Sequence, residues 1–221
     1  MIRAILFDLD GTLVDTLDDL VAATNYALKM GGYPAREKNE IKQFIGNGNT
    51  KLIERSLPEH ARSKAITEKT KQHFFDYYKQ HPAEFSKPYD GIVGLLHNLR
   101  AEGIYVCIVT NKAQEMTETV VPAVFGDFKF DAIVGQSDGV PAKPQPHMAY
   151  IAMNEVGVNA DECFFVGDSY TDMLTGGSGG NIPVGVLWGF REKQELLDSG
   201  ARFIVKHPSE ILDLVRQINQ C

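Results

Sequence analysis

The stretch that decides the fold lies near the start of the chain and reads Ala4-Ile5-Leu6-Phe7-Asp8-Leu9-Asp10-Gly11-Thr12-Leu13-Val14-Asp15. Its apolar run, residues 4–9, predicts a buried strand, and the turn dipeptide Asp10-Gly11 follows. Similar short runs recur along the chain, and they are Tyr105–Thr110, Ala132–Gly135, Cys163–Gly167, Val184–Trp188 and Arg202–Val205. Such runs, alternating with helical periodicity, are typical of a parallel sheet covered by helices. We therefore expect an α/β fold with a Rossmann-like parallel sheet core.

The interval from residue 16 to residue 88 breaks this alternation, because it holds helical patterns and no convincing strand. At its start, Thr16 and Asp19 are placed as the capping box of a helix. Roughly seventy helical residues exceed a simple crossover, which usually takes one helix. We predict an inserted α-helical cap domain over residues 16–88, on a catalytic core formed by residues 1–15 and 89–221. The hinges then lie near Asp15 and near residues 88–91.

Composition and charge exclude several classes of protein. The 221 residues are 43% hydrophobic and 23% charged, a balance that can bury a core. The formal net charge is −7 and no Lys/Arg cluster is present, so we expect no nucleic-acid partner. No apolar run approaches the roughly 18 residues of a membrane span, and Asp8 and Asp10 end the first run too early for a secretory signal. Three cysteines, Cys107, Cys163 and Cys221, are too few for a disulfide framework, so we expect a cytoplasmic protein. The sequence leaves monomer or homodimer open.

The polar residues that follow the predicted strands carry the chemistry, since ligands of an open parallel sheet bind beyond the carboxyl ends of its strands. These residues are Asp8, Asp10, Thr110, Asn111, Lys143, Asp168 and Asp172. Asp8 and Asp10 point the same way in an extended chain, and like charges that close need a cation or a shared proton. The carboxylates of Asp8, Asp10 and Asp168 suit Mg²⁺, which prefers oxygen ligands.

This set of residues suits attack on a phosphate. At about 4 Å and an effective dielectric near 20, two like unit charges repel by roughly 4 kcal/mol. A bound Mg²⁺ and the Lys143 ammonium would offset that repulsion. A carboxylate that attacks phosphorus forms an acyl-phosphate, and a second carboxylate can protonate the leaving alcohol and then activate water. Asp8 and Asp10 fit one nucleophile and one acid/base.

Four segments resemble, in order, motifs I to IV of the haloacid dehalogenase-like hydrolase superfamily. They are Phe7–Asp15, Val109–Asn111, Lys143-Pro144 and Gly167–Asp172. The resemblance implies that Asp8 is the nucleophile and Asp10 the general acid/base. It also implies that Mg²⁺ is held by the Asp10 backbone carbonyl and by the side chains of Asp8 and Asp168.

The same resemblance implies how the phosphoryl group is held. Thr110 and Asn111 would bind it, and Lys143 would bridge it to the nucleophile. Asp172 would act one step away from the metal, orienting Lys143 or a metal-bound water. The resemblance thus implies a catalytic set of Asp8, Asp10, Thr110 and Lys143.

The predicted cap resembles that of the subgroup with phosphoglycolate phosphatases, β-phosphoglucomutases and small pyrophosphatases. Its Gly46-Asn47-Gly48 stretch and the residues around it most resemble phosphoglycolate phosphatase. Glycines allow close approach, and the following helix N-terminus offers free N–H groups to an anion. A substrate carboxylate could sit there, with Lys51 or Arg55 nearby. The resemblance therefore implies hydrolysis of a small phosphorylated metabolite, with 2-phosphoglycolate as the leading substrate.

Other interpretations stay open. Gly46-Asn47-Gly48 also fits an ordinary turn, and Lys51 and Arg55 also fit solvated side chains. A pyrophosphatase, a sugar-phosphate phosphatase or a β-phosphoglucomutase would use the same chemistry. A phospho-accepting signalling module shares the acidic pocket, the hydroxyl and the lysine, but it needs no lid. The family usually places alanines where Gly176–Gly180 lies, so we expect a short, frayed or mobile helix there, because each Gly costs up to about 1 kcal/mol.

Overall fold

A six-stranded parallel sheet lies at the centre of the computed structural model, which describes residues 1–220. Its strands, in the order β5-β4-β1-β6-β7-β8, are Ala132–Gln136, Tyr105–Ala113, Ala4–Phe7, Cys163–Gly167, Ile182–Val186 and Phe203–Val205. β1 is central, with its Phe7 level with Ile108 of β4 and Val166 of β6. Residues that follow β1, β4 and β6 therefore emerge side by side. The predicted run 184–188 is shifted, since β7 begins at Ile182.

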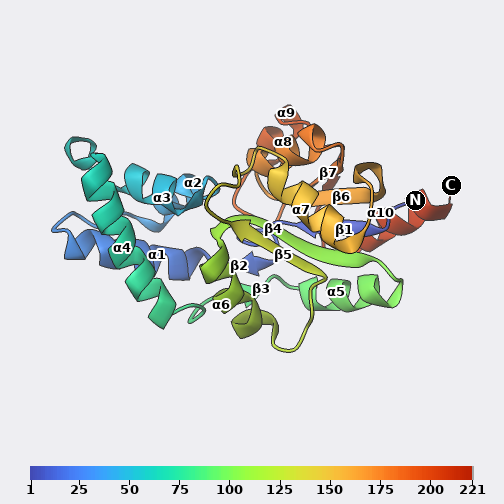
Figure 1. Ribbon diagram of the computed structural model, residues 1–221, viewed down its shortest axis with the longest axis horizontal. Coiled ribbons are helices and arrows are strands. Elements are labelled where there is room, and N and C mark those ends of the chain that lie inside the picture. The colour runs from blue at the N-terminus through green and yellow to red at the C-terminus, as the bar shows by residue number, and fades with distance from the viewer. Residues whose placement is uncertain (221) are drawn as a thin grey trace.

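Helices cover both faces of the sheet (Figure 1). On one face lie α5 (Ile92–Ala101), α6 (Gln114–Phe125) and α10 (Ser209–Gln220), and on the other α7 (His147–Val156) and α8 (Tyr170–Ser178). The side chains of β1 alternate accordingly, with Ile5 and Phe7 in the first layer and Ala4 and Leu6 in the second. The predicted α/β class is confirmed. Within residues 1–220, no helix combines the length and apolar character that a membrane span requires.

Four further helices gather at the end of the molecule away from the N-terminus and α10 (Figure 1). They are α1 (Leu17–Met30), α2 (Lys38–Phe44), α3 (Gly48–Ser56) and α4 (Lys64–Gln80), with a 3₁₀ turn at Glu59–Ala61. Their buried side chains, among them Leu28, Ile53 and Phe74, form an apolar cluster of their own. Met116 and Val120 of α6 join this cluster, so the helical region packs against α6.

A short antiparallel pair joins the chain entering the helical region to the chain leaving it. β2 (Val14–Asp15) pairs with β3 (Lys87–Pro88), with Val14 opposite Pro88. The prediction of no strand between residues 16 and 88 is therefore wrong at its last two residues. Two residues are too few to show the alternation by which a strand is identified.

The predicted capping box at the start of α1 is wrong. The Thr16 hydroxyl is buried and has no hydrogen-bond partner within residues 1–220. The Asp19 carboxylate instead accepts hydrogen bonds from the backbone N–H groups of Phe85 and Ser86, at 3.2 and 2.8 Å, and from the Ser86 hydroxyl. Asp19 thus ties α1 to the segment that follows α4, a contact 66 residues away in sequence.

The glycine-rich segment forms part of a helix. Gly176 and Gly177 lie inside α8, a short helix of nine residues that ends at Ser178. A Cβ atom on Gly176 would lie 2.9 Å from Cβ of Phe165 in β6, closer than side chains approach. The absent side chain at this position lets α8 pack directly on the sheet.

Candidate active site

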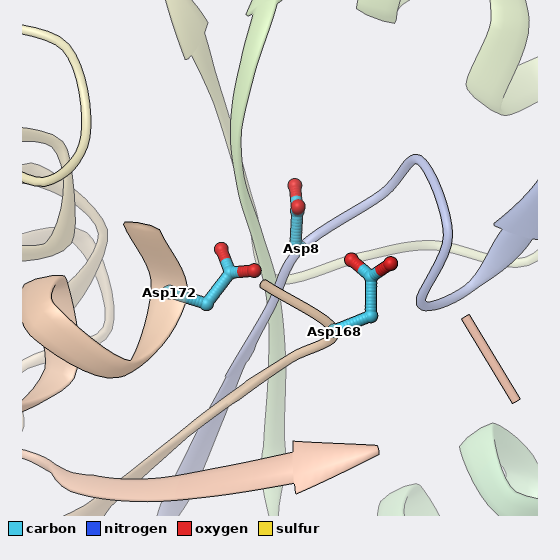
Figure 2. Close-up of side chains that lie close together, drawn as sticks. All are labelled: Asp8, Asp168 and Asp172. Carbon is cyan, nitrogen blue, oxygen red and sulfur yellow. The ribbon is translucent and has the colours of Figure 1, made fainter. Parts of the chain in front are cut away.

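Three buried carboxylates meet at the carboxyl end of the sheet (Figure 2). Asp8 follows β1, Asp168 follows β6, and Asp172 lies in the first turn of α8. Each offers an oxygen atom, and these oxygens all lie within 4.8 Å of one another. β1 and β6 are parallel neighbours, which places the residues after them together.

Lys143 links two of these carboxylates. Its Nζ lies 2.9 Å from Oδ1 of Asp8 and 2.7 Å from Oδ1 of Asp172, and the lysine side chain is 1% exposed. The other oxygen of Asp172 accepts hydrogen bonds from the Ser169 hydroxyl and N–H, at 2.6 and 3.0 Å. Burial alone would lower the pKa of Lys143, but Asp172 and Asp8 raise it above its ordinary value. The lysine is therefore a fixed positive charge beside Asp8.

Negative charge at the site is only partly compensated. Burial, and then the neighbouring Asp172, raises the pKa of Asp8 to about 7, against an ordinary value of 3.8. Burial, Asp172 and Asp8 together raise the pKa of Asp168 to about 8. The Phe190 N–H donates to Oδ2 of Asp168 at 2.6 Å, but no cationic side chain lies within ion-pair distance of Asp168 in residues 1–220. Asp8 and Asp168 would gain from a bound cation.

Asp10 stands apart from these three carboxylates and has its own partner, Lys112. The Lys112 Nζ lies 3.0 and 3.2 Å from the two Asp10 carboxylate oxygens. The lysine side chain is 1% exposed, and its ammonium lies 4.8 Å from the centre of the Tyr78 ring of α4. Lys112 was not among the predicted site residues. The signal was a lysine within β4, directly after Thr110-Asn111, where the strand is buried.

Thr110 and Asn111 reach the same end of the sheet within β4. The Asn111 side-chain amide donates to the carbonyl oxygens of Gly46, at 2.9 Å, and of Lys143, at 3.1 Å. Its Oδ1 accepts from the Lys143 N–H at 2.8 Å. Asn111 thus fixes the Lys143 backbone and contacts the helical region. The Thr110 hydroxyl is buried and accepts from the Lys112 N–H at 3.2 Å.

Residues 5–184 match the protein family described as haloacid dehalogenase-like hydrolase. The chain belongs to this family. A phosphoglycolate phosphatase of Yersinia pestis is 29% identical over 216 residues, which are 97% of this chain and 93% of the relative. An N-acetylmuramic acid 6-phosphate phosphatase of Pseudomonas aeruginosa is 28% identical over 215 residues, 97% and 95% of the two chains. A crystal structure of a predicted phosphoglycolate phosphatase from Haemophilus somnus superposes with a TM-score of 0.88 at 29% identity, covering 96% of this chain and 97% of that chain. The resemblance is confirmed, and the hydrolase is of the phosphatase class.

A pocket of the hydrolase lies between the acidic residues and the helical region. From the helices it is lined by Leu20, Ile45, Gly46, Gly48, Asn49 and Leu52. Asp8, Asp10, Thr110, Asn111, Lys112 and Asp168 line the opposite side. Five of the predicted site residues of the sheet region thus line one pocket, and they are Asp8, Asp10, Thr110, Asn111 and Asp168. Lys143 and Asp172 do not line it and contact Asp8 within the protein.

The other predicted substrate-binding residues of the hydrolase have partners outside the pocket. Asn47 donates its side-chain amide to the Tyr170 hydroxyl at 2.7 Å. Lys51 is exposed and pairs with Glu54 at 2.7 Å. Arg55 donates to the carbonyl oxygen of Phe44 at 3.0 Å. Of the substrate-binding residues predicted in the helical region, only Gly46 and Gly48 line the pocket.

The segment after β7 also contributes residues that were not predicted. Phe190 and Arg191 line the pocket, and Phe190 holds Asp168. A Cβ atom on Gly189 would lie 2.3 Å from Cβ of Asp168 and from the Gly11 carbonyl oxygen. This glycine was a local signal of close approach, but nothing nearby in sequence says which residue is approached.

Proposed function

We propose that the hydrolase cleaves a small phosphate monoester with Mg²⁺, through an aspartyl-phosphate formed on Asp8, and that 2-phosphoglycolate is its substrate. The observation that carries this proposal is the Asp8 carboxylate held 2.9 Å from the buried Lys143 ammonium and close to Asp168. Asp8 lines the pocket, and it shares its lysine partner with Asp172.

The residues present fit Mg²⁺. Asp8 and Asp168 supply carboxylate oxygens, which this ion prefers. Burial, and then the neighbouring carboxylates, raise the pKa of both groups, so a bound cation would favour their charged forms. We propose that these two side chains and the Asp10 backbone carbonyl hold the ion. When bound, Mg²⁺ would offset the repulsion between the negatively charged phosphate and the carboxylates.

The residues of the chain then divide the reaction between them. An Asp8 oxygen attacks phosphorus, an acyl-phosphate bond forms, and the bond from phosphorus to the ester oxygen breaks. Asp10, protonated when the ester binds, gives its proton to the departing alkoxide. It then takes a proton from the water that attacks the acyl-phosphate, which releases inorganic phosphate and restores the Asp8 carboxylate. Lys143 holds Asp8 in place, Asp172 orients Lys143, and Thr110 and Asn111 lie where the phosphoryl oxygens would be bound.

We propose that residues 16–88 form a cap over a core of residues 1–15 and 89–221, and that the cap excludes water while phosphate is transferred. Gly46 and Gly48 would present the start of α3, whose free N–H groups favour an anion such as a substrate carboxylate. Lys51 and Arg55 would add positive charge beyond the pocket without touching the substrate.

A sugar phosphate is the second candidate substrate. A polar cleft beside the pocket shares Phe190 and Arg191 with it, and is also lined by Lys42, Asn47 and Tyr170. A larger leaving group could extend into this cleft. The N-acetylmuramic acid 6-phosphate phosphatase is 28% identical to this chain, against 29% for the Yersinia pestis phosphoglycolate phosphatase.

A panel of phosphorylated compounds tests the proposal. Phosphate release should be highest with 2-phosphoglycolate and should stop when EDTA removes Mg²⁺. Higher kcat/KM with a hexose 6-phosphate, a sugar-acid phosphate or pyrophosphate would reject phosphoglycolate. A stable stoichiometric phosphoprotein without turnover would point to a signalling module instead.

A further inference from the structure

We propose that Arg191 is a positioning residue, which anchors residues 42–48, here called the α2–α3 turn, to the core and so sets Gly46 and Gly48 over Asp8. This inference rests on the proposed function, because it assigns the turn to the substrate side of the active site. Arg191 belongs to the core, in the segment between β7 and α9 (Lys193–Asp198).

The guanidinium of Arg191 crosses from the core to the helical region and makes three hydrogen bonds. Nη1 donates to the Lys42 carbonyl oxygen at 2.8 Å, and Nη2 donates to those of Gln43 and Ile45 at 3.1 and 2.7 Å. Nε faces Glu195 at 3.5 Å, and the arginine side chain is only 14% exposed. One core side chain thus binds three carbonyl groups within four residues of the turn.

These carbonyl groups need a donor. α2 ends at Phe44, so the carbonyls of Lys42 and Gln43 belong to its last four residues, which have no partners inside the helix. A positive charge at the C-terminus of a helix is favourable, and charge-assisted hydrogen bonds are stronger than neutral ones. A planar guanidinium can bind several acceptors at fixed angles, which a lysine ammonium on its flexible stem does less well.

The same segment also holds the acidic centre. The N–H of Phe190, one residue before Arg191, donates to Asp168 at 2.6 Å, and the Phe190 side chain packs against the apolar cluster of the helical region. The turn has two other contacts to the core, Asn111 to Gly46 and Asn47 to Tyr170, each a single hydrogen bond. Within the described residues, Arg191 therefore supplies three of the five side-chain hydrogen bonds between the turn and the core.

Hydrogen exchange and kinetics of Arg191→Ala and Arg191→Lys test the inference. Amides of residues 42–48 should exchange at least about tenfold faster in Arg191→Ala, as expected for lost charge-assisted hydrogen bonds. Exchange in the sheet should not change. The ratio kcat/KM for p-nitrophenyl phosphate and 2-phosphoglycolate should fall by a similar factor, with Arg191→Lys between Arg191→Ala and the unaltered protein. Competitive inhibition by inorganic phosphate, which under the proposed function is bound by Thr110 and Asn111 of the core, should change less than the turnover does.

Arg62→Ala is the matched control. The Arg62 guanidinium also donates to backbone carbonyls, of Leu57 at 3.1 Å and Arg55 at 3.4 Å, but all three residues lie in the helical region. This variant should leave exchange at residues 42–48 and kcat/KM unchanged. Unchanged exchange of the turn in Arg191→Ala, or an equal loss in Arg62→Ala, would overturn the inference. If the protein turned over neither substrate, the proposed function would fail while the exchange measurement still decided the role of Arg191.

Discussion

At the scale of single residues, two lysines give two neighbouring aspartates different surroundings. Lys143 forms ion pairs with both Asp8 and Asp172, whereas Lys112 forms an ion pair with Asp10. Asp8 and Asp10 are two residues apart, yet only Asp8 joins the cluster with Asp168. This separation agrees with one carboxylate that attacks and another that handles protons.

Replacing Asp8 with asparagine should abolish turnover and leave the fold intact. The amide has nearly the same volume but cannot form an acyl-phosphate, so we expect kcat to fall by about 10⁴-fold or more. The Tm without metal should not fall, because a buried and poorly compensated charge has been removed. Steady-state kinetics and thermal unfolding measure both. Turnover near the normal rate would contradict the role of Asp8.

Replacing Lys112 with methionine should destabilise the protein. Asp10 would lose its cation, and breaking a buried ion pair from one side costs about 3 kcal/mol. The double variant Asp10→Asn, Lys112→Met should recover part of this loss, since no unpaired charge remains. Urea unfolding of the two single variants and the double variant measures the coupling. Strictly additive losses would show that the pair does not contribute as a pair.

At the scale of elements, what the sequence reveals depends on how local the signal is. The strands that carry Asp8, Thr110 and Asp168 to the site could be predicted because each contains a short apolar run followed by polar residues, although β4 continues past the predicted end at Thr110 to Ala113. The partners of Arg191 could not, because its contacts join a loop to helix-end carbonyls some 150 residues away. The capping box failed for the same reason, since Asp19 bonds to distant Phe85 and Ser86.

Adjacent glycines of α8 should respond oppositely to alanine. Gly177 has no atom within 4 Å of an added Cβ, so Gly177→Ala should stabilise by about 0.5–1 kcal/mol through better helix propensity. Gly176→Ala should instead destabilise by about 1–3 kcal/mol, because its Cβ would press on Phe165. Chemical unfolding of the two variants checks this. Equal stabilisation by both would show that α8 is not packed tightly on β6.

At the scale of the whole molecule, the residues of the candidate active site come from the helical region and from several separate segments of the sheet region. β2 and β3 hold the two crossings between those regions together, and Asp19 fastens α1 to the second crossing. The link between the two regions therefore combines backbone pairing with the hydrogen bonds of one buried carboxylate.

Stability should fall as pH rises when no metal is present. The pKa values of Asp8 and Asp168 are about 7 and about 8 in the folded protein, against 3.8 ordinarily. The folded state thus keeps protons that the unfolded chain releases, and this contribution, complete below pH 3.8, is lost as pH rises through 7 and 8. Mg²⁺ binds the deprotonated carboxylates, so it should raise Tm more at pH 8.5 than at pH 5. Scans in EDTA and in Mg²⁺ measure this, and an equal Mg²⁺ effect at both pH values would contradict it.

Because β1 lies between β4 and β6, its pairing in the sheet can form only late in synthesis. Ala4 pairs with Tyr105 on one side and with Cys163 on the other. The first strand to leave the ribosome therefore waits for more than a hundred residues before its first neighbour exists, and longer for the second. A nascent chain has all the residues of its helical region well before Asp168 and Asp172 are synthesised and can join Asp8. A chain that ends before residue 168 thus lacks Asp168 and Asp172, the two carboxylates that lie with Asp8 in the folded protein.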